Sequence, residues 1–329
     1  MRKPIDWEAQ LGRRLKLRDL HVFFTVAECS GMGKAAARLG VTTPTVSEAV
    51  ADLEHAIGMK LFDRSSQGVA LTIYGKALLK RGLVAFDELK QGLRDIEFLA
   101  DPTVGELRIA CDESISAATL PLIIHRFAER HPGVVVDVEG FEIGSYAQRL
   151  RDRALELVIT RRGQPDPEHD PHQELNVEIL FEDQIVVVAG KDTPWARRTK
   201  LDLAELAGER WILTAPGTRN YDAVATAFRS RGLAMPRPSV TTLSVDLRTT
   251  LLSIGPYIAT FPRSVIQLHG ERFGLKALPL DLPARPWPVA LLTLKNRTLS
   301  PVTERFIECA HAVVKPLAGV RASRKRSQM

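Results

Sequence analysis

The sequence predicts an α+β protein of several domains, with an N-terminal winged helix-turn-helix, a long linker helix and a C-terminal two-lobed α/β domain. Three features of the 329 residues predict it. Apolar residues recur at helical spacing through most of the first hundred residues, and glycines end the short helical segments. A proline-free stretch over residues 73–99 then keeps apolar residues three and four apart. From residue 105 onward, β-branched runs alternate with helical segments, which indicates parallel strands flanked by helices.

Breaks in these patterns give the expected domain boundaries. Asp101-Pro102-Thr103 ends the long helix, and a polar, proline-rich stretch from Gly163 to Pro171 separates two similar α/β halves. Two such halves enclose a cleft at the carboxyl ends of their strands, where small ligands bind. The expected division is an extension over 1–16, a winged helix-turn-helix over 17–72, a linker helix over 73–100, lobe I over 103–163 and 282–315, lobe II over 164–281, and a basic, disordered tail over 316–329.

Composition excludes several classes of protein. No apolar run approaches the roughly 18 residues that a membrane span requires, and the charged N-terminus lacks the apolar core of a secretory signal. We therefore expect a cytoplasmic protein with no membrane partner. Cys29, Cys111 and Cys309 are too far apart and too few for a disulfide scaffold or a cysteine-rich zinc site. The net charge of +6 is concentrated at the two ends of the chain, which suits a polyanionic partner, although we interpret the C-terminal basic run as a solvated tail.

The segment from Lys34 to Gly58 has the spacing of a helix-turn-helix. A short helix ends at Gly40, and Thr42-Thr43-Pro44 starts the next with a capping hydroxyl and a first-turn proline. In this motif the N-terminal end of the second helix enters the major groove, where hydroxyls contact phosphates or base edges and a carboxylate accepts from a cytosine amino group. A three-helix bundle used for protein contacts is the alternative.

A hairpin with a polar, glycine-containing tip follows over residues 61–72 and is predicted to be the wing. Arg64, at the base of this wing, is expected to touch phosphate or the minor groove. The expected DNA-contacting residues are Lys34, Thr42, Thr43, Pro44, Thr45, Ser47, Glu48 and Arg64.

The long helix over 73–99 carries an apolar stripe and has no domain of its own to cover, which predicts that it pairs subunits. Packing within one subunit is the alternative, and the length of the helix makes it the weaker one. The expected dimerisation residues are Leu79, Leu83, Phe86 and Leu93.

No catalytic signature is present. The chain contains no G-x-S-x-G, H-E-x-x-H or Walker sequence, and His169-x-x-His172 has no further His or Cys placed to complete a zinc site. The sequence therefore predicts no catalytic residue, no metal and no cofactor. An α/β enzyme with a helical appendage stays an alternative, because a convergent active site leaves no short motif.

Residues 17–79 resemble the N-terminal domain of LysR-type transcriptional regulators. Apolar, glycine and threonine positions carry the resemblance: Leu17-x-x-Leu20-x-x-Phe23, Gly31 to Lys34, Ala35-Ala36-x-x-Leu39, Val41 to Ser47, Leu53-Glu54, Ile57-Gly58, Leu61-Phe62-Asp63-Arg64 and Leu71-Thr72-x-x-Gly75. It continues to about Leu317 through weaker matches at Leu120-Pro121, His131-Pro132 and Leu157-Val158-Ile159. The resemblance implies a winged helix-turn-helix that binds promoter DNA and a linker helix that pairs subunits into homodimers or homotetramers. It also implies a two-lobed effector domain like that of periplasmic binding proteins.

The same resemblance implies a small-molecule effector between the lobes. Carried over position by position, the effector-binding residues are Ser114, Ser116, Gly144, Ser145, Thr160, Arg161, Gly217 and Thr218. Hydroxyls and helix N-termini suit an anion, and Arg161 pairs either with an effector carboxylate or with a local acid. An organic acid is therefore the expected effector, and RNA polymerase is a further candidate partner. A regulator whose C-terminal domain binds no metabolite is the remaining alternative.

Overall fold

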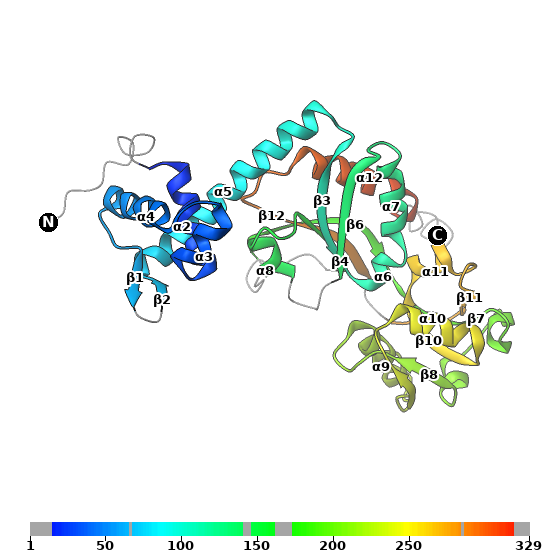
Figure 1. Ribbon diagram of the computed structural model, residues 1–329. Coiled ribbons are helices and arrows are strands. Elements are labelled where there is room, and N and C mark those ends of the chain that lie inside the picture. The colour runs from blue at the N-terminus through cyan, green and yellow to red at the C-terminus, as the bar shows by residue number, and fades with distance from the viewer. Residues whose placement is uncertain (1–14, 66–67, 141–145, 162–172, 284–285, 319–329) are drawn as a thin grey trace. The chain divides into compact units, whose positions relative to one another are not determined.

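The computed structural model describes residues 15–65, 68–140, 146–161, 173–283 and 286–318. Within it the chain forms two compact units, residues 1–93 and 94–329 (Figure 1). Most of the expected N-terminal extension and basic tail lies outside the described residues, as do Gly144, Ser145, His169 and His172.

The N-terminal unit is a helix-turn-helix with a β-hairpin wing. Its helices are α2 (Leu17–Cys29), α3 (Met32–Leu39) and α4 (Thr43–Ile57), and strands β1 (Phe62–Ser65) and β2 (Gly68–Leu71) pair antiparallel. The predicted caps are confirmed: Thr42 accepts a hydrogen bond from the Thr45 N–H, Pro44 is in the first turn of α4, and Gly40 and Gly58 end α3 and α4 with φ of 66° and 75°. Side chains from the three helices and the wing share one buried core.

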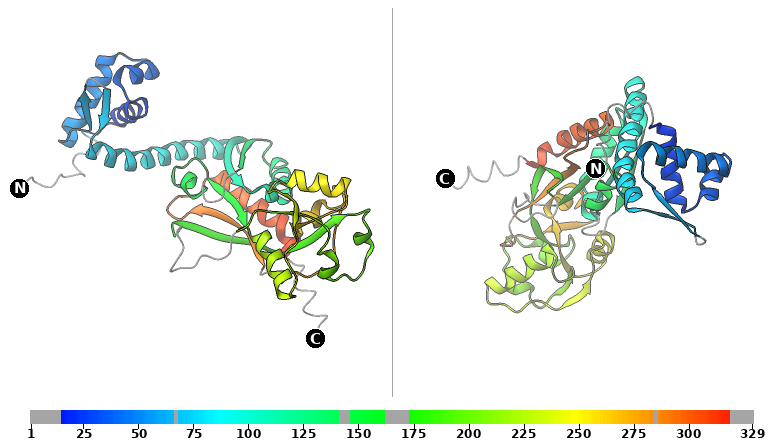
Figure 2. Two further views of the ribbon diagram at one scale, coloured as in Figure 1. Left: turned by 90° about the horizontal axis from the view of Figure 1, so that it is seen from below. Right: turned by 90° about the vertical axis from the view of Figure 1, so that its left-hand side faces the viewer.

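Helix α5 (Ile73–Ala100) is one continuous helix that begins directly after the wing (Figure 2). Its first half packs on α2, where Gly82 permits close approach because an added Cβ would overlap the ring of Phe24. Phe86 also packs on Phe24, edge to face at 5.0 Å, and Leu79 contacts the same core. Leu79 and Phe86 therefore pack within their own subunit, which is the alternative to subunit pairing given above for this helix. Leu83 and Leu93 are 44% and 64% exposed, so they remain predicted pairing positions.

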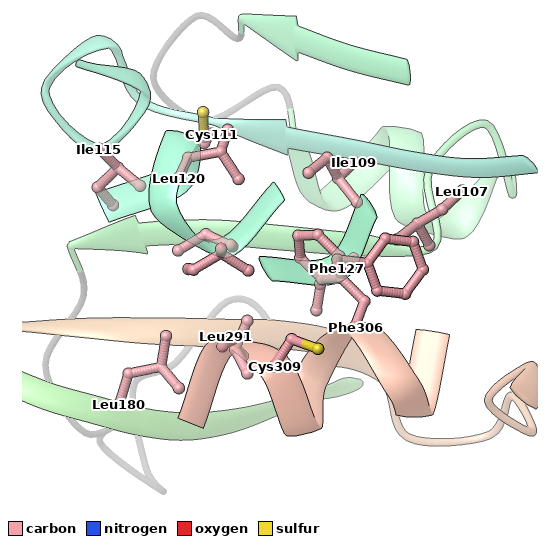
Figure 3. Close-up of a cluster of buried hydrophobic side chains, with 14 of the residues drawn as sticks. Leu107, Ile109, Cys111, Ile115, Leu120, Phe127, Leu180, Leu291, Phe306 and Cys309 are labelled. Atoms are coloured by element: carbon pink, nitrogen blue, oxygen red, sulfur yellow. The ribbon is translucent and has the colours of Figure 1, made fainter. Parts of the chain in front are cut away.

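Lobe I of the C-terminal unit is built on a five-stranded sheet of order β4-β3-β5-β12-β6. Its strands are β3 (Val104–Cys111), β4 (Gly133–Gly140), β5 (Leu157–Arg161), β6 (Leu175–Asp183) and β12 (Trp287–Leu294), and its helices are α6 (Glu113–Ser116), α7 (Thr119–Ala128), α8 (Tyr146–Arg151) and α12 (Pro301–Ala318). Strands β3, β4 and β5 run parallel, whereas β12 is antiparallel to β5 and β6. Helices α7 and α12 cover one face of the sheet, where Phe127 and Phe306 pack at 5.4 Å in the largest core (Figure 3).

Lobe II is built on a second five-stranded sheet of order β11-β7-β10-β8-β9. Its strands are β7 (Ile185–Gly190), β8 (Arg210–Leu213), β9 (Pro238–Thr241), β10 (Tyr257–Pro262) and β11 (Leu275–Ala277), and its helices are α9 (Arg219–Ser230), α10 (Val245–Ile254) and α11 (Arg263–His269), with short 3-10 helices at Pro194–Arg197 and Leu203–Leu206. Strands β8, β9 and β10 run parallel, and β7 is antiparallel to both its neighbours. Each face of the sheet has its own apolar core.

The chain crosses from lobe I to lobe II at Gln184, later than the boundary expected at residue 164. Strand β6 pairs with β12 of lobe I along its length, so residues 175–183 belong to lobe I. The sequence pattern missed this strand because β6 lies at the edge of its sheet and carries Glu178 and Glu182 among its apolar residues.

Candidate functional site

The N-terminal end of α4 is a polar surface opposite a buried apolar face. Val46, Val50 and Leu53 of this helix are completely buried. The expected DNA-contacting residues that lie on α3 and around the start of α4 are the exposed Lys34, Thr42, Thr43, Pro44 and Glu48 and the half-buried Thr45 and Ser47. A helix start also presents backbone N–H groups that suit a phosphate. The surface therefore combines hydroxyls, one lysine and helix N–H groups.

One buried carboxylate anchors the wing to α4. Glu54 is 6% exposed, and its Oε1 accepts from the Leu61 and Phe62 backbone N–H groups at 2.8 and 3.2 Å, while Oε2 pairs with Lys60 Nζ at 2.7 Å. Burial acts to raise the pKa of Glu54, but the hydrogen bonds from Lys60 and the two backbone N–H groups outweigh it, so the pKa is lowered. Strand β1 then places Arg64 opposite Val69 in the hairpin. The Arg64 side chain is outside the described part of the structure.

Glu54→Gln should lower the free energy of unfolding of the N-terminal unit by about 1.5–3 kcal/mol at pH 7. The reason is that a neutral amide replaces the charged carboxylate that accepts three hydrogen bonds. The folded-state pKa lies below the unfolded value of about 4.3. The carboxylate's contribution is therefore complete above the unfolded pKa and is lost as pH falls through the folded pKa. Urea unfolding at a series of pH values should show the parent and the variant converging in acid. Glu48→Gln, at an exposed position of the same helix, is the control. If Glu54→Gln lowers the free energy of unfolding equally at every pH, the stabilisation does not come from the ionised carboxylate.

In the C-terminal unit, one other expected effector-binding residue, Ser114, contacts Arg161, whose side chain is 2% exposed. Its Nη1 donates to Asp112 Oδ1 at 3.1 Å and to Ser114 Oγ. Its Nη2 donates to Asp183 Oδ2 at 3.1 Å and to Ser264 Oγ at 3.4 Å. Arg161 was expected to pair either with an effector carboxylate or with a local acid. The structure favours the local acids, because the carboxylates of Asp112 and Asp183 both pair with its guanidinium.

The Arg161 cluster also joins the lobes next to the crossover. Asp183, 3% exposed, ends β6 of lobe I, and Ser264 belongs to α11 of lobe II. Ser264 donates to Asp183 through its hydroxyl at 2.6 Å and its backbone N–H at 3.1 Å, and the Gln184 N–H donates to the same carboxylate at 2.9 Å. A buried network of this kind fixes local geometry because each polar group depends on its partners.

Lobe II contributes an exposed cation, Arg219, beside the capped start of α9. Thr218 caps α9 by accepting from the Tyr221 N–H at 3.4 Å, and Gly217 before it has φ of 81°. The next residue, Arg219, is exposed, and its guanidinium lies 5.5 Å from the ring centre of Trp287 on β12 of lobe I. Among the described residues, no carboxylate lies within ion-pair distance of Arg219.

The other expected effector positions are less informative. Thr160 is 7% exposed, Ser116 is exposed, and Gly144 and Ser145 are not described. Sequence reasoning missed Asp112, although its position directly after β3 is a usable signal, and it missed Asp183, Arg219 and Trp287, which no motif marks. A hollow of about 430 Å³ beside α10, lined by residues such as Lys191, Thr249 and Arg272, contains none of the expected effector residues.

Two searches of the described ranges bear on other classes of site. No three side chains of His, Cys, Asp or Glu gather there as ligands for a metal ion. In the same ranges, no helix combines the length and the apolar character needed to cross a bilayer.

A winged helix-turn-helix with one free face on its second helix, followed by a two-lobed α/β domain, defines a class of ligand-responsive DNA-binding regulators. Residues 17–76 match the family described as bacterial regulatory helix-turn-helix protein, lysR family, and residues 100–315 match the LysR substrate binding domain. The chain belongs to the LysR family of transcriptional regulators. It is a regulator with a DNA-binding domain and an effector-binding domain, and not an enzyme.

Individual relatives agree with this assignment. TdcA, an HTH-type transcriptional regulator of Escherichia coli (strain K12), is 29% identical over 252 residues, which cover 75% of this chain and 79% of TdcA. The crystal structure of ArgP from Mycobacterium tuberculosis matches with a TM-score of 0.60 at 20% identity, over 91% of this chain and 97% of that one. Full-length CbnR complexed with its target DNA matches with a TM-score of 0.50 at 21% identity, over 91% and 99% of the two chains. At such identities the structural likeness shows the fold.

Proposed function

We propose that this regulator binds promoter DNA in the cytoplasm as a homodimer or homotetramer, with the start of α4 in the major groove, the wing on the adjacent backbone and RNA polymerase as a partner at the promoter. The observation that carries the proposal is the division of α4 into a buried apolar face and a polar face whose hydroxyls are exposed or half-buried. CbnR, which shares this fold, has been solved in complex with its target DNA, and this supports DNA binding by the fold.

The proposed DNA contacts divide into two kinds that one experiment separates. Arg64→Ala should weaken binding to every sequence and reduce the salt dependence by about one charge, because a phosphate contact carries no sequence information. Thr45→Ala and Ser47→Ala should instead change the preference among half-sites, by roughly 1–3 kcal/mol per base pair. Gel shifts on the gene's own promoter, across salt concentrations and half-site variants, measure both. Undiminished binding by the Arg64 variant would remove that residue from the interface.

The proposed effector is a small organic acid held between the lobes. Ser114, Ser116, Thr160, Gly217 and Thr218 stay in this proposal as its neighbours, together with Gly144 and Ser145. Arg161 has two carboxylate partners, so its part in the proposal is to hold Asp112 and Ser114 in place. Arg219 supports the anionic assignment better, because it is exposed, lies at the positive end of α9 and has no acid partner among the described residues.

A thermal-shift screen of organic acids and sugars tests the effector proposal. A true acid effector should add about 2.7 kcal/mol of stability at a hundredfold excess over its Kd. Arg219→Ala should abolish this response, and Arg229→Ala, at the exposed other end of α9, should preserve it. A screen in which only neutral ligands stabilise would contradict the acid, and a screen with no stabilising ligand would favour a regulator without a metabolite effector.

A further inference from the structure

The two lobes also meet through Glu113, the first residue of α6 in lobe I. Its Oε1 accepts a hydrogen bond from the Val245 backbone N–H at 2.8 Å and lies 3.4 Å from the Ser244 hydroxyl. Both partners lie at the start of α10 in lobe II, about 130 residues further along the chain. A carboxylate of one lobe thus occupies the beginning of a helix of the other.

The start of α10 has a specific need for this carboxylate. Ser244 caps the helix by accepting from the Leu247 N–H at 3.3 Å. The first N–H groups of a helix find no acceptor within it, and Val245 N–H, which is one of them, is directed at Glu113. The helix dipole adds positive charge at the same place, so an anionic acceptor is favoured over a neutral one.

A buried arginine adds further positive charge beneath this contact. Arg248, one turn into α10, is 3% exposed and donates to the backbone carbonyls of Leu243, Ser244 and Thr260 at 2.9–3.2 Å. Burial lowers the pKa of Arg248 to about 10, and the charge of Glu113 acts against that fall. No carboxylate lies within ion-pair distance of this guanidinium among the described residues. The acid whose charge acts on Arg248 therefore belongs to the opposite lobe.

We propose that Glu113 is a latch that holds lobe I on α10 of lobe II in the effector-free protein. The Asp183–Ser264 network lies beside the crossover at Gln184 and acts as the hinge, whereas the Glu113 contact closes the lobes across it.

Amide hydrogen exchange of the full-length protein, with no effector added, tests the latch directly. In Glu113→Ala and in Glu113→Gln, the amide of Val245 should exchange roughly tenfold or more faster than in the parent, because a hydrogen bond to a charged acceptor is lost. Glu129→Ala removes another acid of lobe I, whose partner is His125 of α7, and should leave the exchange of Val245 unchanged. Parent-like exchange in both Glu113 variants would overturn the proposal.

A second readout separates a latch from a local cap. Trp287 of lobe I lies against Arg219 of lobe II, so separation of the lobes should expose its ring and move its emission to longer wavelength. We expect this shift in both Glu113 variants and its absence when Trp287→Phe is added. Faster exchange at Val245 with unchanged Trp287 emission would show that Glu113 only caps α10, and would overturn the latch. Both readouts are made without effector, so their failure is distinct from failure of the acid screen, which overturns the proposed function.

Discussion

Replacing Arg161 by alanine should lower the free energy of unfolding of the C-terminal unit by about 3–5 kcal/mol, because it leaves the carboxylate of Asp183 buried without its counter-charge. Asp183 is 3% exposed and keeps only neutral donors, from Ser264 and Gln184, once the guanidinium is gone. Asp112, 28% exposed, can turn to water and contributes less to the loss. For a domain of this size the change corresponds to a fall in Tm of roughly 6–20 °C.

Urea unfolding of three variants measures this effect and identifies its source. Adding Asp183→Asn to Arg161→Ala should recover at least about 1 kcal/mol, because the second substitution removes the unpaired charge. Arg219→Ala, at an exposed position of the other lobe, should change stability by less than about 0.5 kcal/mol. A loss below about 1 kcal/mol in Arg161→Ala would show that the buried pair is not formed in solution. Because Arg161→Ala perturbs the fold in this way, its loss of an effector response says little about ligand contact, and Arg219 is the better probe.

Glutamate at both Leu83 and Leu93 should convert the protein to a monomer of 36.4 kDa. These leucines are 44% and 64% exposed on α5, whereas Leu79 and Phe86 of the same helix pack within the subunit. In a dimer of this variant, the α5 helix of each subunit would bury two unpaired charges. The free-energy cost of that burial exceeds the stabilisation that the apolar contact between the helices provides. A monomer also loses one half-site of DNA contacts, so promoter affinity should fall in parallel.

Light scattering of the purified double variant gives its mass, and urea unfolding confirms that the N-terminal unit is still folded. Leu17→Glu is the matched control, because Leu17 is 59% exposed on α2 and lies outside α5. That variant should keep the parental mass. If the double variant keeps it too, the subunits pair through another surface.

The division of α5 shows where prediction from sequence reached its limit. Spacing alone placed Leu79, Leu83, Phe86 and Leu93 on one apolar stripe, since a helix of this length has a single period of 3.6 residues. The position of α2 decides which part of this stripe is buried against the N-terminal unit. Helix α2 comes close to α5 at Gly82, because glycine has no side chain there. The pattern of one helix contains no information about the helix packed on it.

The effector region shows the same limit for charge. Ser114 and Arg161 were expected there from family resemblance, and the structure does bring them into contact. The acids that pair with Arg161 are 49 and 22 residues away in the sequence, and the acceptor of Val245 is 132 residues away. None of these pairs has a local signature.

By itself, the sequence determined the features that depend on a few neighbouring residues. The helix caps at Thr42, Gly40 and Gly58, the wing, the proline-free linker helix and the alternation of strands and helices all follow from backbone preference and short-range periodicity. Only the tertiary structure decided that β6 belongs to lobe I, that Arg161 is neutralised by Asp112 and Asp183, and that Glu113 reaches α10. The physical reason is that sheet pairing and the packing of the lobes bring together groups from distant parts of the chain, and a charge acquires its role only from the groups that then surround it.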